Sequence, residues 1–366
     1  MAQRAGNLGI LGRVASYLRS HPVILLLLLS PGIPEYLSSS SPLNAIILNP
    51  GGFLFQIAAN LGLYGPGVLL IREAMVRWKK GWASVLLLGA AYGILEEGIA
   101  LSTLFYSGAG PVGQLGTFGH WLGVSWVWAA GVVPVHMVLS ISLPILLLGL
   151  AVPTTQGRSL LSGRRTIAAF MILGLDVTLL LLFVVFAEHF WMGWPIFAGA
   201  FILIGALVYI SRRLPSDVLT ASTDLPRRGP RAMTMVGILF FPGLLFSQFI
   251  GMGVGLPPAI VFGLVILVQG LLLFYVLKKI GRSRNERTKV GFAIGILLPI
   301  SVFGFLAEIQ LPVVLLVDFG FILFFRGLWR TYRPPFITTD NSKLPSNPVS
   351  LPFSENPPAK ITQRES

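Results

Sequence analysis

The sequence predicts an all-α, polytopic integral membrane protein: a helical bundle of about ten transmembrane helices with both termini on the cytoplasmic side. The mean hydropathy is +0.79, and only 11% of the residues are charged, whereas soluble domains carry roughly 25%. Apolar runs of about 20 residues, long enough to span a bilayer core, recur along the chain. Lys and Arg residues stand in alternate gaps between these runs. Together, these observations exclude a soluble globular domain.

The apolar runs define the expected helices in order. The first run is the shortest, and Pro31 and Pro34 interrupt it. Spans are expected near residues 22–37, 51–71, 82–105, 120–150, 166–187, 193–211, 233–252, 257–277, 290–308 and 310–328.

The charge pattern predicts the orientation of these spans. The gaps 38–50, 106–119, 188–192 and 253–256 contain no Lys or Arg, while the gaps between them contain several. Because basic residues mark the cytoplasmic side, an even number of spans and a multi-pass protein of the plasma membrane are expected. The net charge of +13 is attributed to anionic lipid headgroups of the bilayer, and no nucleic-acid partner is expected.

Three regions are expected along the chain. Residues 1–21 form a cytoplasmic N-terminus, in which residues 8–20 alternate apolar side chains with Arg13 and Arg19 and predict a short interfacial helix. Residues 22–332 form the membrane domain. Residues 333–366 are rich in proline and predict a disordered cytoplasmic tail. The chain has no cysteine, which excludes disulfides, thiolate metal sites and a cysteine nucleophile.

Five ionisable residues lie deep within the predicted spans: Glu96, Glu97, His136, Asp176 and Asp318. Placing a charge in the bilayer core costs roughly 2.5–3.5 kcal/mol on insertion scales, so each is a candidate functional residue. The same layer contains no Lys or Arg. At least some of these carboxyl groups are therefore expected to hold or share a proton at neutral pH.

The adjacent Glu96 and Glu97 are the strongest candidates. Gly89 and Gly93 precede them at one-turn spacing, and small residues at this spacing let a neighbouring helix approach closely. Two carboxyl groups only a few ångströms apart do not both ionise easily in a low dielectric, which makes a general acid/base available.

The second candidate element is His136 with Ser140 and Pro144, which are spaced four and four residues apart along one helix face. Pro144 has no N–H group to donate to the Ser140 carbonyl, and Pro134 likewise leaves the Ala130 carbonyl free. A bent helix with polar backbone facing a cavity is expected here.

The Glu-Glu pair followed by an intramembrane His resembles the CPBP family of intramembrane proteases, the CAAX-processing and bacteriocin-processing enzymes. In that family the pair opens a Glu-Glu-x-x-x-Arg motif, whereas this chain has Leu101 at the Arg position. The resemblance implies that Glu96 and Glu97 activate a water molecule and that His136 binds it or stabilises the oxyanion. The stretch from Tyr92 to His136 also looks like uncharacterised prokaryotic membrane proteins.

Three functions remain open from the sequence. The first is a glutamate-dependent intramembrane peptidase-like hydrolase, with Glu96, Glu97 and His136 as catalytic residues acting on a membrane-associated peptide. The second is a proton-coupled transporter of a small molecule, for which Asp176 and Asp318, in spans five and ten, occupy matching places. The third is a scaffold whose polar layer only fixes helix packing. Ser140, Asp176 and Asp318 are expected to bind substrate or relay protons, and no cofactor or metal is expected.

Overall fold

The computed structural model describes residues 10–215, 229–279 and 285–332. The tail predicted for residues 333–366 and most of the loop 212–232 lie outside these ranges. Nearly all of the described elements are helices, as the sequence predicts.

The first half of the chain contains the shorter and more irregular elements. They are α1 (Ile10–Ser20), α2 (Pro22–Pro31), η2 (Gly32–Leu37), α3 (Ala45–Leu48), α4 (Pro50–Arg77), α5 (Trp82–Ile94), η3 (Leu95–Ala100), η4 (Gly110–Gly116), β1 (His120–Trp121), β2 (Val124–Ser125), α6 (Trp126–Val135), η5 (His136–Ser142), α7 (Leu143–Ala151) and η6 (Pro153–Thr155). Segments η2, η3 and η5 are π-helical, and η4 and η6 are 3₁₀ helices.

The second half consists of long, regular helices. They are α8 (Gly163–Ala187), α9 (Trp194–Arg213), α10 (Pro230–Gly253), α11 (Pro258–Lys279), α12 (Glu286–Ala307) and α13 (Leu315–Thr331).

Eight helical spans among the described residues are long and apolar enough to cross a membrane: residues 50–77, 82–100, 126–151, 163–187, 194–213, 230–253, 258–278 and 286–307. The first predicted span instead forms the second arm of a helix pair, α1 and α2–η2, that bends by 104° after Ser20. The last predicted span is α13, with 17 residues. The helical membrane fold therefore matches the prediction, while two of the ten predicted spans are short or bent.

Two predicted helix boundaries differ from the structure. The span expected to reach residue 105 ends at Ala100, because Leu101 is followed by Ser102 with a positive φ of 57°. The span expected to begin at residue 120 begins at Trp126. Residues 120–125 instead form a short β-hairpin, with strands of two residues each, in which His120 pairs with Ser125.

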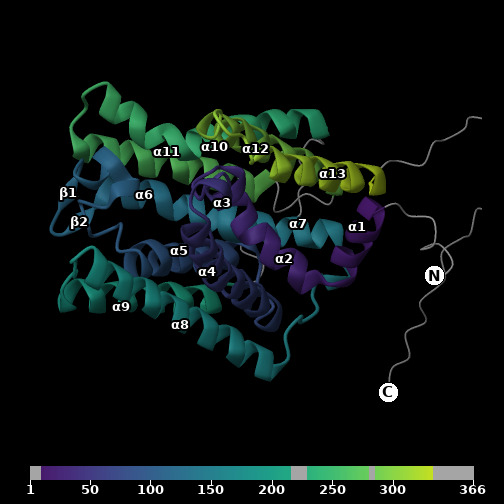
Figure 1. Cartoon of the computed structure of the whole chain (residues 1–366), viewed down its shortest axis with the longest axis horizontal. Helices are drawn as coiled ribbons and strands as arrows, with labels where there is room; N and C mark the ends of the chain where they lie inside the picture. The colour runs from purple at the N-terminus through teal and green to yellow at the C-terminus, as the bar shows by residue number, and fades with distance from the viewer. Residues whose placement is uncertain (1–9, 216–228, 280–284, 333–366) are drawn as a thin grey trace, which may run out of the picture. The chain divides into compact units, whose positions relative to one another are not determined.

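The helices pack in layers around α6 and α7, which follow one another through the middle of the bundle (Figure 1). On one side lie α10, α11 and α12, and on the other lie α4, α5, α8 and α9. Within these layers α10 packs on α12, α4 on α8, and α5 on α9, while η5 packs closely on α5. Helix α5 is the buried centre, with 83% of its apolar window inside the protein, compared with 11% for α9. The outer helices therefore present apolar surface to lipid, as the exposed Phe170, Leu175 and Leu179 of α8 show.

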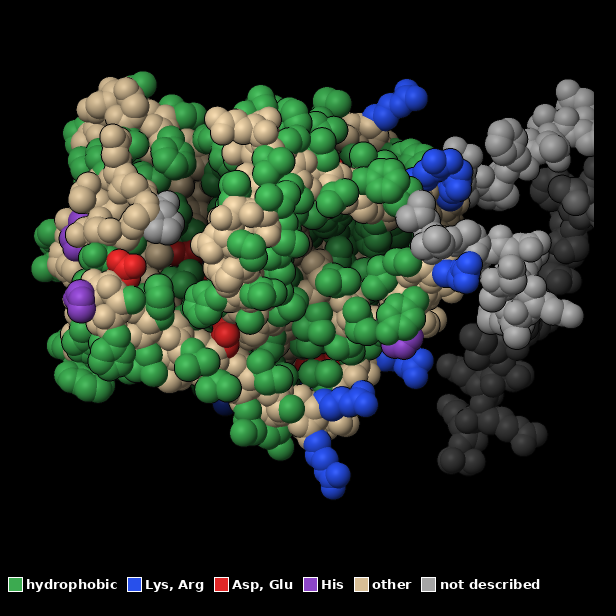
Figure 2. All heavy atoms as spheres, in the orientation of Figure 1, with side chains coloured by type: hydrophobic (Ala, Val, Ile, Leu, Met, Phe, Trp, Pro, Cys, Tyr) green, Lys and Arg blue, Asp and Glu red, His purple; other side chains and the backbone are tan. Residues whose placement is uncertain are grey.

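Lys and Arg side chains gather mainly at one end of the molecule in the view of Figure 2, where α1 and the end of α13 also lie in Figure 1. Arg72, near the C-terminal end of α4, is almost fully buried and pairs with Glu73 at 2.8 Å. Glu73 also accepts a hydrogen bond from the Leu160 amide, and Arg72 donates to the carbonyls of Thr155 and Arg158. The pair thus anchors the loop between α7 and α8.

Candidate functional site

Three π-helical segments hold the polar residues of the bundle centre. Glu35 lies in η2, Glu96 and Glu97 in η3, and His136 and Ser140 in η5. A π-helical turn inserts an extra residue into an α-helix, turns the side chains that follow, and is found frequently at functional sites. The segments η2 and η5 contact one another, and η5 packs on α5 just before η3.

Proline explains part of this irregular backbone. Pro144 leaves the Ser140 carbonyl without its helical donor, as the sequence predicts, and the Ser30 hydroxyl donates to that carbonyl at 2.8 Å. Pro34 in turn cannot donate to the carbonyl of Ser30. The Ser30 hydroxyl thus joins the two proline-bearing helices at positions where proline removes the donor four residues on.

Two glycines of α5 bring η5 against the acids. A Cβ atom on Gly89 would lie 2.9 Å from the Met137 Cα, and a Cβ atom on Gly93 would lie 3.2 Å from the His136 Cβ. The close helix approach predicted from Gly89 and Gly93 is therefore confirmed. Its partner is the helix that carries His136.

His136 lies between the two glutamates and contacts a different one with each ring nitrogen. Its Nε2 is 2.9 Å from Glu97 Oε1, and its Nδ1 is 3.0 Å from Glu96 Oε2 and 3.0 Å from the Ser140 hydroxyl. All four side chains are buried, with Glu96 only 1% exposed. The imidazole therefore bridges the two carboxyl groups within one buried cluster, the Glu–His cluster.

The two glutamates are held differently. Glu97 accepts from the Thr103 hydroxyl in addition to His136, and Thr103 accepts in turn from the Trp128 indole at 3.2 Å. Glu96 Oε2 has no well-directed hydrogen bond within the described residues, although it lies beside the imidazole. Both glutamates therefore pair with His136, with Thr103 beside Glu97 and Tyr92 beside Glu96.

Glu35 is a third buried acid that the sequence analysis missed. It accepts hydrogen bonds from the hydroxyls of Tyr64, at 2.5 Å, and Ser41, at 2.6 Å. The Tyr64 ring centre lies 6.3 Å from that of His136, and Asn60 extends the polar contacts by donating to Ser41. The sequence signal for Glu35 is an acid directly after Pro34 within the apolar run 22–37, which the prolines interrupt.

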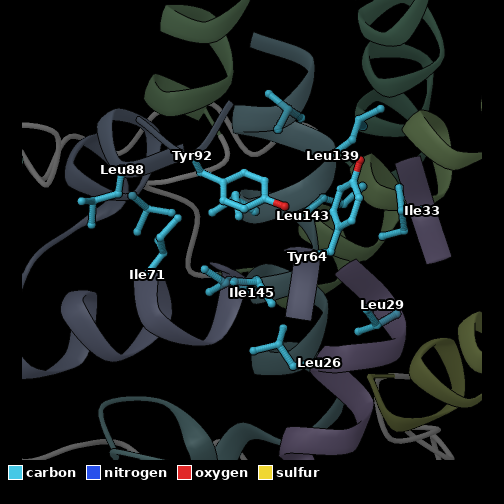
Figure 3. Packing of buried hydrophobic residues seen from close by; sticks show 14 of the residues in the cluster. Leu26, Leu29, Ile33, Tyr64, Ile71, Leu88, Tyr92, Leu139, Leu143 and Ile145 are labelled. Atoms are coloured by element: carbon cyan, nitrogen blue, oxygen red, sulfur yellow. The ribbon is translucent and has the colours of Figure 1, made fainter. Parts of the chain in front are cut away.

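Tyr92 lies at the centre of the cluster, one turn before Glu96. Its ring centre is 6.1 Å from that of Tyr64 and 6.3 Å from that of His136, and its hydroxyl points towards Tyr64 among buried apolar side chains (Figure 3). Tyr92 lies within electrostatic range of Glu96, Glu35 and Asp176. Neither its hydroxyl nor Asp176 Oδ2 has a well-directed hydrogen bond in the described part of the chain.

The structure separates the two aspartates that the sequence placed in matching positions. Asp176 packs against α4, where a Cβ atom on Gly62 would lie 2.7 Å from its Oδ1, and it lies within electrostatic range of Glu96. Asp318 instead accepts from Ser301, at 2.5 Å, between α12 and α13. Ser140 and Asp176 therefore lie at the Glu–His cluster, while the hydrogen bond of Asp318 belongs to another part of the bundle.

The cluster does not have the form of a metal site. Glu96 and Glu97 contact different nitrogens of the imidazole, so their oxygens lie on different sides of the ring. Within the described ranges, no group of three or more His, Asp or Glu side chains is placed to hold a metal ion.

Compared with protein-family models, with curated proteins and with solved structures, the chain matches none.

Proposed function

We propose that the protein is a glutamate-dependent intramembrane hydrolase and that Glu96 is its general base. The observation that carries this proposal is the unequal engagement of the two glutamates around His136. Glu97 is held by Thr103 and by the imidazole, whereas Glu96 Oε2 has no well-directed hydrogen bond. Glu96 Oε2 lies 3.0 Å from the imidazole and beside Tyr92, and this looser hold leaves Glu96 the freer of the two acids to accept a proton.

The proposed chemistry gives Glu96 the transfer of the proton and His136 the stabilisation of the oxyanion. Glu96 takes a proton from water, and the water oxygen adds to the carbonyl carbon of a peptide bond. Glu97 holds Nε2 of His136, and the Nδ1–H group exchanges its contacts with Glu96 and Ser140 for a hydrogen bond to the developing oxyanion. The C–N bond then breaks, and the proton held by Glu96 passes to the leaving amine. The likeness to the CPBP proteases supports the same assignment for the Glu pair and His136.

A proton-coupled transporter is the second candidate, and Asp176 and Glu35 favour it. They add two acids from α8 and η2 to the Glu–His cluster, and a series of acids at one depth is typical of a proton relay. The location of Asp318 apart from this cluster weighs against a relay shared equally by two matching halves.

The proposed setting is the plasma membrane, with the basic end of the bundle in the cytoplasm. The distribution of Lys and Arg supports this orientation, and so does the apolar surface of the outer helices. In this arrangement the bent first helix and α13 complete the set of ten spans.

The test is cleavage of membrane-anchored peptides by the full chain reconstituted in lipid vesicles. Glu96→Gln is expected to reduce cleavage by about 10²-fold or more, because positioned general bases contribute 10²–10⁴-fold. Asp318→Asn is the matched control, because it also neutralises an acid of the bundle but away from His136, and it is expected to cleave normally.

The same vesicles distinguish the two candidate functions. Loading them with a pH-sensitive dye reports proton movement driven by added solutes. Peptide cleavage that depends on Glu96, without solute-driven proton uptake, supports the hydrolase. Proton uptake that depends on Glu96, without cleavage, would overturn it in favour of transport.

A further inference from the structure

A basic pocket lies at the ends of several helices, and its lining includes none of Glu96, Glu97 and His136. A pocket of about 440 Å³ opens between the ends of α4, α5, α7 and α12. Arg72, Lys79, Lys80 and Lys289 contribute four positive charges to its lining, and Glu286 is the one acid among the lining residues. Its volume lies within the range of small-molecule sites, about 300–1,000 Å³.

The groups around this pocket favour an anion. Arg72 is held by Glu73 and by two backbone carbonyls, and Lys80 donates to the Leu214 carbonyl. Lys79 has no ion pair within the described residues, while Lys289 has only a 3.2 Å contact with the half-exposed Glu286. Helix α5 starts here after Gly81 without a side-chain cap. An uncapped helix N-terminus presents free N–H groups and a partial positive charge to an anion.

The wall opposite these charges is apolar and continues towards the middle of the membrane. Ile145, Leu148 and Leu150 line the pocket. Trp82 and Leu146 are shared with a second, smaller cavity of about 60 Å³ between α5, η5 and the helices α11 and α12. Leu86, Val138, Val276 and Phe292 contribute to that cavity, and its lining contains no charged side chain. A cationic pocket joined to an apolar crevice matches an amphiphile better than it matches a soluble anion.

We infer that this compartment binds one anionic glycerophospholipid from the adjacent leaflet. The phosphate lies against Lys79, Lys289 and the N-terminus of α5. One acyl chain passes Trp82 and Leu146 into the crevice between α5 and α11. This site is independent of the proposed hydrolysis and does not require it.

The probe is phosphatidylglycerol brominated on its acyl chains, which quenches tryptophan fluorescence on contact. The full chain is reconstituted in phosphatidylcholine vesicles with increasing fractions of brominated phosphatidylglycerol, and in a parallel series with brominated phosphatidylcholine. Quenching is expected to saturate at a lower fraction of the anionic lipid. The Trp82→Phe variant is expected to lose that high-affinity component, because Trp82 lines both cavities.

Charge-neutralising variants distinguish a specific lipid-binding site from nonspecific attraction of anionic lipids to the basic surface. Lys79→Gln with Lys289→Gln is expected to weaken the high-affinity component about 100-fold, because losing a charge-assisted hydrogen bond to a bound phosphate costs roughly tenfold for each lysine. Lys278→Gln with Arg330→Gln removes the same charge at the same end but outside the pocket lining. This control pair is expected to keep the high-affinity component.

Three outcomes would overturn the inference. The first is equal quenching by the two brominated lipids. The second is an equal loss in the control pair, which would indicate only diffuse attraction. The third is displacement of the lipid by excess inorganic phosphate, which would indicate a soluble anion as the occupant.

Discussion

At the scale of single residues, the site depends on how His136 is held. Its Nε2 faces Glu97, and its Nδ1 faces both Glu96 and Ser140. The orientation of the ring is therefore fixed on both sides. The sequence shows which residues are costly to bury but not which ones meet. Contacts such as that between Thr103 and Glu97 depend on a turn after Ala100 that the apolar pattern does not reveal.

The hydroxyl of Ser140 provides a prediction at this scale. Ser140→Ala removes the hydrogen bond to His136 Nδ1 and is expected to lower the free energy of unfolding by about 1 kcal/mol. Ser142→Ala is the matched control in the same π-helical segment, because the Ser142 hydroxyl makes no hydrogen bond within the described residues. Unfolding in detergent measures both changes, and an equal effect of the two substitutions would contradict the role given to Ser140.

At the scale of elements, three π-helical segments turn the polar side chains towards one another. Pro34 in η2 and Pro144 just after η5 each remove a backbone donor, and the Ser30 hydroxyl joins the two helices by donating to the Ser140 carbonyl. The prolines and their spacing are visible in the sequence and predict a bend. The extra residue in each turn is not visible, because local propensity does not distinguish an α-helical turn from a π-helical one.

The approach of η5 to α5 gives a prediction at the element scale. Gly89→Ala places a Cβ atom 2.9 Å from the Met137 Cα and forces the two backbones apart. A loss of about 1–3 kcal/mol is expected, because overpacking of this kind costs that amount. The shift also moves His136 relative to Glu96, so the proposed activity should fall together with stability.

Gly174→Ala is the control for this helix contact. A Cβ atom on Gly174 of α8 meets nothing within 4 Å, so the substitution is expected to be neutral or to stabilise the helix by up to about 1 kcal/mol. Thermal unfolding of the two variants side by side measures the difference. Equal stability of the Gly89 and Gly174 variants would mean that the helices are not in close contact.

At the scale of the whole molecule, composition and charge predict the class of fold well. Nearly all of the apolar runs became helices at about the predicted residues, because the bilayer leaves few other ways to satisfy the backbone. The first run and α13 differ from the other spans, because the first run forms one arm of a bent helix pair and α13 has only 17 residues. The hydropathy pattern also overlooked Glu35, because it lies inside the interrupted first run.

The proposed orientation can be tested with single cysteines, because the chain has none of its own. Gly110→Cys is expected to react with a membrane-impermeant maleimide added to intact cells. Ser222→Cys is expected to react only after the cells are opened. The reverse pattern would place the basic end outside and invert the proposed topology.

The most direct measurement of the central claim is carbodiimide labelling of the protein in lipid vesicles, followed by mass spectrometry of its peptides. A hydrophobic carbodiimide modifies a carboxyl group within the membrane while it holds a proton, and the proposed base Glu96 holds one between the activation of water and the release of the amine. The predicted result is an adduct on Glu96, with little on the hydrogen-bonded Glu97 and Asp318. Labelling of Asp318 without labelling of Glu96 would mean that the cluster around His136 only packs helices together.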